Sequence, residues 1–190
     1  MAKSNSTVIA IVGLPGAGKT ITADFFRKKN IPVLRFGEIT DEKMRIQGLP
    51  ITQESERTVR EQLRQDLGMA AYAIKMEPKI RAAIAKHNPV VIDGLRSWEE
   101  YTYLEEKLSH LILLAIYASP KIRYQRLSER KGRHLTITEA HERDIAELNA
   151  LHMGPPIAIA DYLIKNEGSV DQLYKDLETF LEKVTHAGKS

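Results

Sequence analysis

The feature that most constrains the fold is a glycine-rich loop that directly follows a buried strand. The loop reads Gly13-Leu14-Pro15-Gly16-Ala17-Gly18-Lys19-Thr20 and fits the pattern G-x-x-x-x-G-K-[S/T]. The run before it, TVIAIV, is small or β-branched throughout, as in a strand that is buried on both faces. Apolar residues at helical spacing, Ile21, Phe25 and Phe26, come after it. A strand, this loop and a helix in that order form the context in which the pattern binds phosphate.

Each part of this P-loop has a role in holding a nucleoside triphosphate. The glycines let backbone N–H groups converge on phosphate oxygens, and the following helix N-terminus adds partial positive charge. Lys19 can reach the β- and γ-phosphate oxygens, and the Thr20 hydroxyl can ligate Mg²⁺. We therefore predict that residues 13–20 bind ATP, that Lys19 is catalytic and that Thr20 is a metal ligand. A tight turn with a surface lysine is the alternative, but it would need neither Thr20 nor the preceding strand.

Length, cysteine content and charge restrict the class of protein. The 190 residues suffice for one domain with a buried core, and the absence of cysteine excludes disulfides, thiolate nucleophiles and cysteine-based zinc sites. The net charge is only +3 and the basic residues are spread along the chain, so we expect no nucleic-acid partner. The longest apolar run, residues 111–118, is strand-sized, so we expect no membrane span and a cytoplasmic location.

Strand and helix patterns alternate along the chain, which predicts an α/β fold with a parallel sheet. Further strands are expected at residues 32–36, 90–92, 111–117 and 162–164. Helical patterns occupy residues 19–29, 39–47, 97–107, 120–130, 138–151 and 170–184. Residues 54–86 are mostly helical, with interruptions expected near Gly68 and Pro78, and a break is expected at Gly154-Pro155-Pro156.

A carboxylate and an arginine follow the strand at residues 90–92. Asp93 ends this strand and Arg96 comes three residues later. Because the carboxyl ends of parallel strands face the ligand crevice, Asp93 can hold Mg²⁺ through a water or orient an acceptor. Arg96 can bind a phosphate with its planar fork. The ordinary alternatives are that Asp93 caps the helix near Ser97 and that Arg96 forms a surface ion pair.

Four arginines recur before and within a polar stretch at residues 131–138. Arg123, Arg126, Arg130 and Arg133 would share one face of a helix that extended so far. Such a run is ordinarily a solvated face, but phosphoryl transfer needs cations on the migrating phosphate and a closure that excludes water. Residues 131–151 are therefore interpreted as a lid. Arg143 on its returning helix is either another lid cation or the partner of Glu139.

The P-loop, Asp93-Gly94-Leu95-Arg96, the Arg126/Arg130 pair and residues 160–169 follow one another as in the P-loop nucleoside monophosphate kinases. The chain resembles this family over nearly its whole length, and most closely resembles a poorly characterised branch, common in archaea, that is related to adenylate kinase and dephospho-CoA kinase. The resemblance implies a single P-loop kinase-like domain whose five-stranded parallel sheet has the order 2-3-1-4-5. It implies a core of residues 7–37, 87–130 and 152–185, an acceptor-binding helical insert at 38–86 and a lid at 131–151.

The resemblance also implies roles for individual residues. Arg126 and Arg130 match the lid-entry arginines, so both are predicted to be catalytic, together with Lys19 and Asp93. Asn166 and Gly168 match the loop whose backbone lies against the adenine ring, which predicts that they bind ATP. Arg96 matches the arginine that holds the acceptor phosphate, with one residue fewer between Asp and Arg than in adenylate kinases.

The predicted acceptor site departs from the family pattern at one position. Gly37 and Glu38 resemble the family's Gly-Asp motif and are predicted to bind the acceptor. Where relatives carry an arginine three residues after that acid, this chain has Asp41, which removes a phosphate ligand. Arg35, Arg45 and Arg60 are possible substitutes, and the predicted site includes Arg45 and Arg60 beside Arg96.

Together these patterns predict a phosphotransferase that uses ATP and Mg²⁺ and acts on a small phosphorylated, nucleotide-like acceptor. AMP and dephospho-CoA are the first acceptors to test. Two other functions stay open: a regulatory or RNA-associated NTPase that hydrolyses ATP, and a nucleotide-binding module without turnover. Recovery of the γ-phosphate on an acceptor distinguishes the kinase from the hydrolase.

Overall fold

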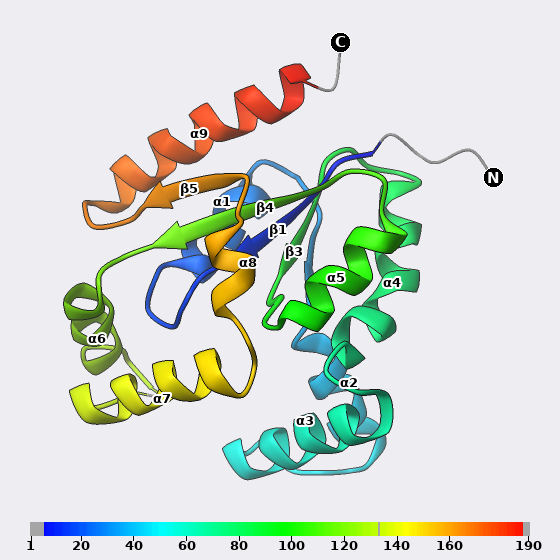
Figure 1. Cartoon of the computed structure of the whole chain (residues 1–190), viewed down its shortest axis with the longest axis vertical. Coiled ribbons are helices and arrows are strands. Elements are labelled where there is room, and N and C mark those ends of the chain that lie inside the picture. Colours follow the sequence, from blue (N-terminus) through cyan, green and yellow to red (C-terminus); the bar gives the residue numbers. More distant parts are fainter. Residues whose placement is uncertain (1–5, 133, 188–190) are drawn as a thin grey trace.

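A computed structural model of the chain describes residues 6–132 and 134–187. Its one sheet contains β1 (Val8–Val12), β2 (Val33–Arg35), β3 (Val90–Asp93), β4 (Leu111–Tyr117) and β5 (Tyr162–Lys165). The strands lie in the order β2-β3-β1-β4-β5 and every neighbouring pair is parallel (Figure 1). This confirms the predicted sheet and places the P-loop, which follows β1, at the middle of its carboxyl edge.

The central strand β1 is buried on both faces, as its sequence predicts. Val8, Ala10 and Val12 belong to one apolar cluster, and Ile9 and Ile11 belong to a second on the opposite face. Each fully buried aliphatic side chain of this kind stabilises the fold by about 1.5–3 kcal/mol. The P-loop therefore begins at one of the most firmly held points of the chain.

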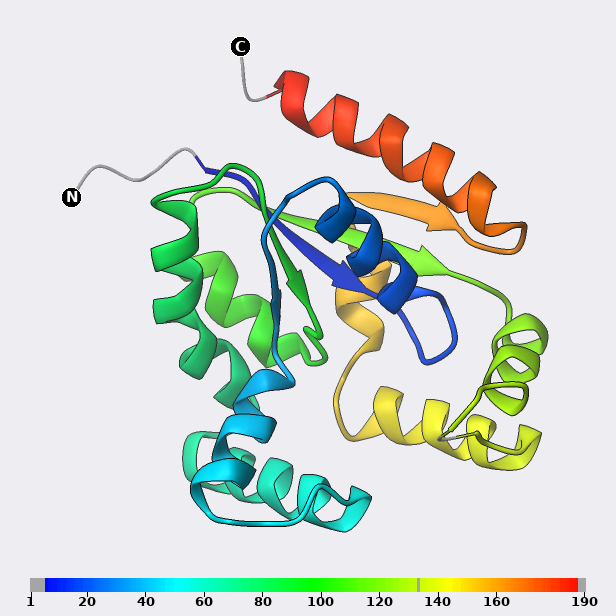
Figure 2. The same cartoon turned by 180° about the vertical axis from the view of Figure 1, so that it is seen from behind.

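Helices cover both faces of the sheet and extend beyond its carboxyl edge. Their bounds are α1 (Lys19–Lys28), α2 (Glu38–Ile46), α3 (Gln53–Leu67), α4 (Ala71–Ile84), α5 (Trp98–Lys107), α6 (Pro120–Ser128), α7 (Ile137–Asn149), α8 (Gly154–Ala158) and α9 (Val170–Ala187). α1 and α9 pack on one face, seen in Figure 2, and α4, α5 and α8 pack on the other. α2 and α3 lie on one side of the carboxyl edge, and α6 and α7 lie on the other side (Figure 1).

The structure corrects two of the expected helix breaks. Gly68 does end α3, with a φ of 77°, but Pro78 lies inside α4. A proline there costs about 3 kcal/mol, which the burial of Tyr72, Met76 and Ile80 on the same helix offsets. Residues 154–156 form the first turn of α8, where a proline is tolerated because the first N–H groups of a helix lack intrahelical partners.

The helices at residues 38–84 and 137–149 fall inside the predicted insert and lid, whose boundaries remain a prediction. Among the helices of the described residues, none has both the length and the apolar character needed to cross a membrane.

Candidate active site

A cleft of about 950 Å³ lies at the carboxyl edge of the sheet, between α2 and α3 on one side and α6 and α7 on the other. The P-loop and the ends of β2 and β3 form its floor. The predicted site residues that line it are Pro15, Gly16, Gly18, Lys19, Thr20, Gly37, Arg60, Asp93, Arg96, Arg126, Arg130, Asn166 and Gly168. Residues from six separate segments of the chain thus meet in one space.

Two residues predicted for the acceptor site, Glu38 and Arg45, do not line this cleft. Arg45 is exposed in the last turn of α2. Thr40 and Asp41 of the same helix do line it. Acceptor binding by Glu38 and Arg45 stays a prediction. Gly13, Leu14 and Ala17 belong to the P-loop but are absent from the cleft lining.

The P-loop approaches its neighbours so closely that side chains are excluded at two glycines. Gly13 has a φ of 144°, and a Cβ atom there would overlap the Ile116 carbonyl oxygen of β4. Gly18 has a φ of 113°, and a Cβ atom there would overlap the Asn166 side-chain amide. Left-handed backbone of this kind costs an ordinary residue energy that glycine avoids. The loop's shape is thus fixed by β4 and by the segment after β5.

Lys19 is folded back onto its own loop. Its Nζ atom donates hydrogen bonds to the carbonyl oxygens of Gly13 and Leu14, the latter at 3.2 Å. Burial and the nearby Arg96 guanidinium lower the pKa of Lys19 to about 8, while the carboxylates of Glu147 and Asp93 oppose that shift. A triphosphate placed in the loop would add negative charge and favour the protonated amine.

Asp93 lies beside the P-loop because β3 pairs with β1, where its Cα atom is opposite that of Ile11. Burial raises the pKa of Asp93, and the positive charge of Lys19 counteracts this most strongly. The helix-capping alternative for Asp93 fails, since Ser97 caps α5 by accepting a hydrogen bond from the Glu100 N–H at 3.0 Å. Asp93 thus remains available to a ligand.

Arg96 and α7 meet across the cleft through Glu147. One guanidinium nitrogen of Arg96 lies 3.8 Å from a Glu147 carboxylate oxygen, and Nε of Arg143 donates to the same oxygen at 3.3 Å. Glu139, one of the two alternatives considered for Arg143, instead forms a capping box with Thr136. The ion pair predicted as the ordinary alternative for Arg96 is therefore present, with a partner from the predicted lid.

The four arginines do not share one function. Arg123 is buried and forms a double ion pair with Asp144 of α7, at 2.8 and 2.6 Å, and also donates to the Pro15 carbonyl. It therefore joins α6, α7 and the P-loop, which corrects the expectation of a common cationic face. Arg126 and Arg130 line the cleft, Arg130 from beyond the end of α6, and Arg133 lies outside the described residues.

Besides Arg96, three arginines line the acceptor half of the cleft. Arg60 pairs with Glu56 at 3.3 Å. The Arg64 guanidinium lies 5.7 Å from the centre of the Tyr72 ring, and its buried Nε has no hydrogen-bond partner among the described residues. Arg35 at the end of β2 is ion-paired with Asp41. This half of the cleft is suited to an anionic ligand.

Comparison with known proteins agrees with this geometry. Residues 9–147 match the family described as AAA domain. A UPF0200 protein of Pyrococcus abyssi is 35% identical over 184 residues, which cover 94% of this chain and 97% of the relative. The chain belongs to the UPF0200 family. The predicted resemblance to a poorly characterised archaeal branch of P-loop kinase-like proteins is thereby confirmed.

Two solved structures share the fold of this UPF0200 chain. A gluconokinase from Sinorhizobium meliloti superimposes with a TM-score of 0.57, at 13% identity, over 97% of this chain and 96% of that one. A shikimate kinase from Bacteroides thetaiotaomicron gives a TM-score of 0.58, at 18% identity, over 93% and 98%. At such identities the likeness establishes a kinase-like fold only.

Asn166, which is predicted to bind ATP, also makes structural contacts that the sequence did not reveal. Its side-chain amide donates a hydrogen bond to the Ala17 carbonyl at 2.7 Å, and its backbone carbonyl accepts a hydrogen bond from the Arg126 guanidinium at 2.9 Å. The residue is buried and therefore connects the segment after β5 to the P-loop and to α6. A long-range contact of this kind has no signal in local sequence spacing.

Asn166→Ala is expected to destabilise the fold by about 1–3 kcal/mol, because it leaves the buried Ala17 carbonyl without a donor. ATP affinity should also fall, because the P-loop loses the hydrogen bond that connects it to the segment after β5. Chemical denaturation and ATP titration measure the two effects, with Asn149→Ala at the exposed end of α7 as the control. Equal stability of Asn166→Ala and wild type would contradict the bracing role.

Glu100 is a site residue that the sequence analysis missed. It lines the cleft, is 1% exposed and accepts a hydrogen bond from the Arg96 N–H at 2.7 Å. Burial raises the pKa of Glu100 to about 7, and both the hydrogen bond from the Arg96 N–H and the charge of Arg64 oppose this shift. Its only sequence signal is its spacing three residues after Ser97, which is typical of an ordinary helix start.

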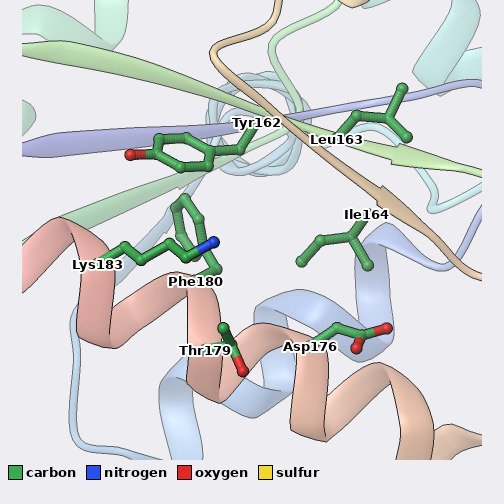
Figure 3. A pocket seen from close by; sticks show the side chains of 7 residues that line it. All are labelled: Tyr162, Leu163, Ile164, Asp176, Thr179, Phe180 and Lys183. Carbon is green, nitrogen blue, oxygen red and sulfur yellow. The ribbon is translucent and has the colours of Figure 1, made fainter.

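A smaller hollow lies between β5 and α9, away from the P-loop (Figure 3). Its walls are Tyr162, Leu163, Ile164, Asp176, Thr179, Phe180 and Lys183. It contains none of the predicted site residues and is separate from the cleft.

Proposed function

We propose that this chain is an ATP-dependent phosphotransferase that moves the γ-phosphate to a small phosphorylated, nucleotide-like acceptor, such as AMP or dephospho-CoA. The observation that carries the proposal is that the P-loop and a second set of arginines face one cleft. A donor and an acceptor bound in such a cleft would be close enough to react, which supplies much of the catalytic effect in phosphoryl transfer.

The donor half offers each part that ATP requires. The P-loop backbone would hold the triphosphate, and Lys19 would leave its carbonyl partners to bind the β- and γ-phosphate oxygens. Thr20 and Asp93 both line the cleft and present oxygen atoms, the ligand type that Mg²⁺ prefers, with Asp93 acting through a water. Mg²⁺ bound with ATP would neutralise charge on the phosphate oxygens.

Transfer breaks the bond between the γ-phosphorus and the β–γ bridging oxygen and forms a bond to an acceptor oxygen. Negative charge spreads over the migrating group, and Arg126 and Arg130, which line the same cleft as the P-loop, would stabilise it. Closure of the predicted lid would exclude water and suppress hydrolysis.

The acceptor half favours a phosphorylated acceptor over a neutral one. Arg60, Arg64 and Arg96 all line it, and their guanidinium groups offer several N–H donors to phosphate oxygens, a stronger interaction than they could form with a neutral hydroxyl group. The hydroxyl groups of Tyr72 and Thr40 are hydrogen-bonded to each other at 2.6 Å. With the Tyr72 ring they form a flat and partly polar wall of the cleft, which is suited to a ring system.

Measurement of ADP formation with and without candidate acceptors tests this proposal. AMP and dephospho-CoA should accelerate ADP formation, whereas gluconate and shikimate, hydroxyl acceptors suggested by the names of the two structural neighbours, should not. ATP turnover that no phosphorylated acceptor accelerates would favour the hydrolase, and acceleration by gluconate or shikimate would contradict the acceptor class.

Arg96→Ala is expected to weaken acceptor binding by about 1.5–3 kcal/mol, the range for hydrogen bonds to charged groups, while ATP affinity stays close to that of wild type. Lysine should restore only part of the loss, since it lacks the planar fork. Separate titrations with ATP and AMP measure both affinities, with Arg57→Ala on the exposed side of α3 as the control. Equal AMP affinity in all variants would assign Arg96 to the ion pair with Glu147 alone.

A further inference from the structure

We propose that Arg35 is a specificity residue that binds the phosphate of the acceptor, and that Gly37 and Asp41 fix the position of its guanidinium. This inference rests on the proposed function for the identity of the ligand. Arg35, Gly37 and Asp41 all line the cleft, on the side opposite α6 and α7.

The register of the sheet places Arg35 beside the centre of the cleft. Arg35 is the last residue of β2, and its Cα atom is opposite that of Asp93 at the end of β3. Side chains of directly paired residues in a parallel sheet leave the same face, so the arginine and the carboxylate are neighbours. The next residue, Phe36, donates its N–H to the Asp93 carbonyl at 2.9 Å and holds the two strand ends together.

The backbone at Gly37 makes room for this guanidinium. Gly37 has a φ of −58°, which any residue adopts, so conformational freedom does not explain a glycine there. A Cβ atom on Gly37 would lie 2.6 Å from one terminal nitrogen of Arg35 and 3.4 Å from its central carbon. Glycine at this position therefore lets the arginine lie flat over the turn between β2 and α2.

Asp41 holds the other terminal nitrogen. The Arg35–Asp41 ion pair joins the end of β2 to the first turns of α2, and both side chains are about half exposed, at 46% and 50%. An ion pair so accessible to water contributes little to stability. A guanidinium has five N–H donors, so the remaining donors of Arg35 are free to bind phosphate oxygens.

The position of Arg35 distinguishes it from Arg60 and Arg64. These two arginines extend from α3, where Arg60 pairs with Glu56 and the Arg64 guanidinium lies near the ring of Tyr72 from α4. Arg35 alone among the three extends from the sheet edge that carries Asp93. A phosphate between Arg35 and Arg96 would be held from β2 on one side and from the β3–α5 segment on the other.

Inorganic phosphate is the probe for a direct test. It is titrated, with binding followed by calorimetry, into protein already saturated with Mg²⁺ and a non-hydrolysable ATP analogue, so that the P-loop is filled. Arg35→Ala should weaken phosphate binding about tenfold to a hundredfold, the effect of losing a hydrogen bond to a charged group. Arg35→Lys should recover part of this, and affinity for the ATP analogue should not change.

Gly37→Ala provides an independent test, because its backbone conformation accepts alanine and the added methyl group would displace only the Arg35 guanidinium. It should weaken phosphate binding in the same direction as Arg35→Ala without lowering the temperature of unfolding. Lys79→Ala is the matched control: Lys79 pairs with Glu42 of α2, both side chains are 44% exposed, and Lys79 lies outside the cleft lining. Its phosphate affinity should equal that of wild type.

Equal phosphate affinity in wild type, Arg35→Ala and Gly37→Ala would overturn the inference, and so would a wild-type protein that binds no phosphate when the P-loop is filled. Loss of phosphate binding in Arg35→Ala, in a protein that phosphorylates no acceptor, would uphold the inference and refute the proposed function. An acceptor that is phosphorylated with an identical KM in wild type and Arg35→Ala would uphold the proposed function and overturn the inference.

Discussion

Lys19→Ala is expected to keep the fold and to lose most of the turnover, by at least about 10²-fold. The charge that Lys19 neutralises on the β- and γ-phosphate oxygens grows as the phosphate migrates, and loss of one such preorganised donor costs about 10²–10³ in kcat. Stability should not fall, because burial and Arg96 hold the pKa of Lys19 down to about 8 and so disfavour its charged form.

Thermal unfolding and steady-state turnover of Lys19→Ala, each compared with wild type, check this prediction. Lys121→Ala, which changes an exposed lysine in the first turn of α6, controls for the loss of one positive charge. Undiminished turnover in Lys19→Ala would remove this lysine from the mechanism.

Arg130→Ala is expected to lower kcat by about 10³-fold, equivalent to about 4 kcal/mol. Arginines that meet the migrating phosphate contribute about 10³–10⁵ in kcat, because their charge is used most fully in the transition state. Arg130 gives a cleaner test than Arg126, whose removal would also release the Asn166 carbonyl.

The matched control for Arg130 is Arg57→Ala. Arg57 is exposed on α3, pairs with Glu61 and lies outside the cleft lining, so neither kcat nor any KM should change. A variant at Arg130 that keeps its kcat and shows only a raised KM for ATP would assign Arg130 to ground-state binding.

The sequence predicted those parts of the site that depend on local order. The P-loop is one continuous segment between a buried strand and a helix, so its residues and their predicted roles follow from spacing alone. Asp93 and Arg96 were found in the same way, because strand ends in a parallel sheet share one edge. The order of the strands came only from the family resemblance.

Contacts between distant segments could not be read from spacing. In the sequence, Arg123 occupies a helical position equivalent to that of Arg126. In the structure, it is buried and ion-paired with Asp144 of α7, which lies 21 residues later in the chain. In the sequence, Glu100 and Glu147 resemble ordinary helix residues. The structure shows that both are buried and line the cleft. That Arg35 and Arg60 line the cleft whereas Arg45 does not likewise depends on how distant segments pack together.

The most direct test of the proposed phosphotransfer is to follow the γ-phosphate itself. Wild-type protein is incubated with Mg²⁺ and ATP labelled in the γ-phosphate, with AMP and with dephospho-CoA in separate reactions, and the labelled products are separated. Label recovered on one of these acceptors, and lost with Lys19→Ala, is the result that the proposed function predicts. Label found only in inorganic phosphate, at a rate that neither acceptor changes, would contradict it and identify the chain as a hydrolase.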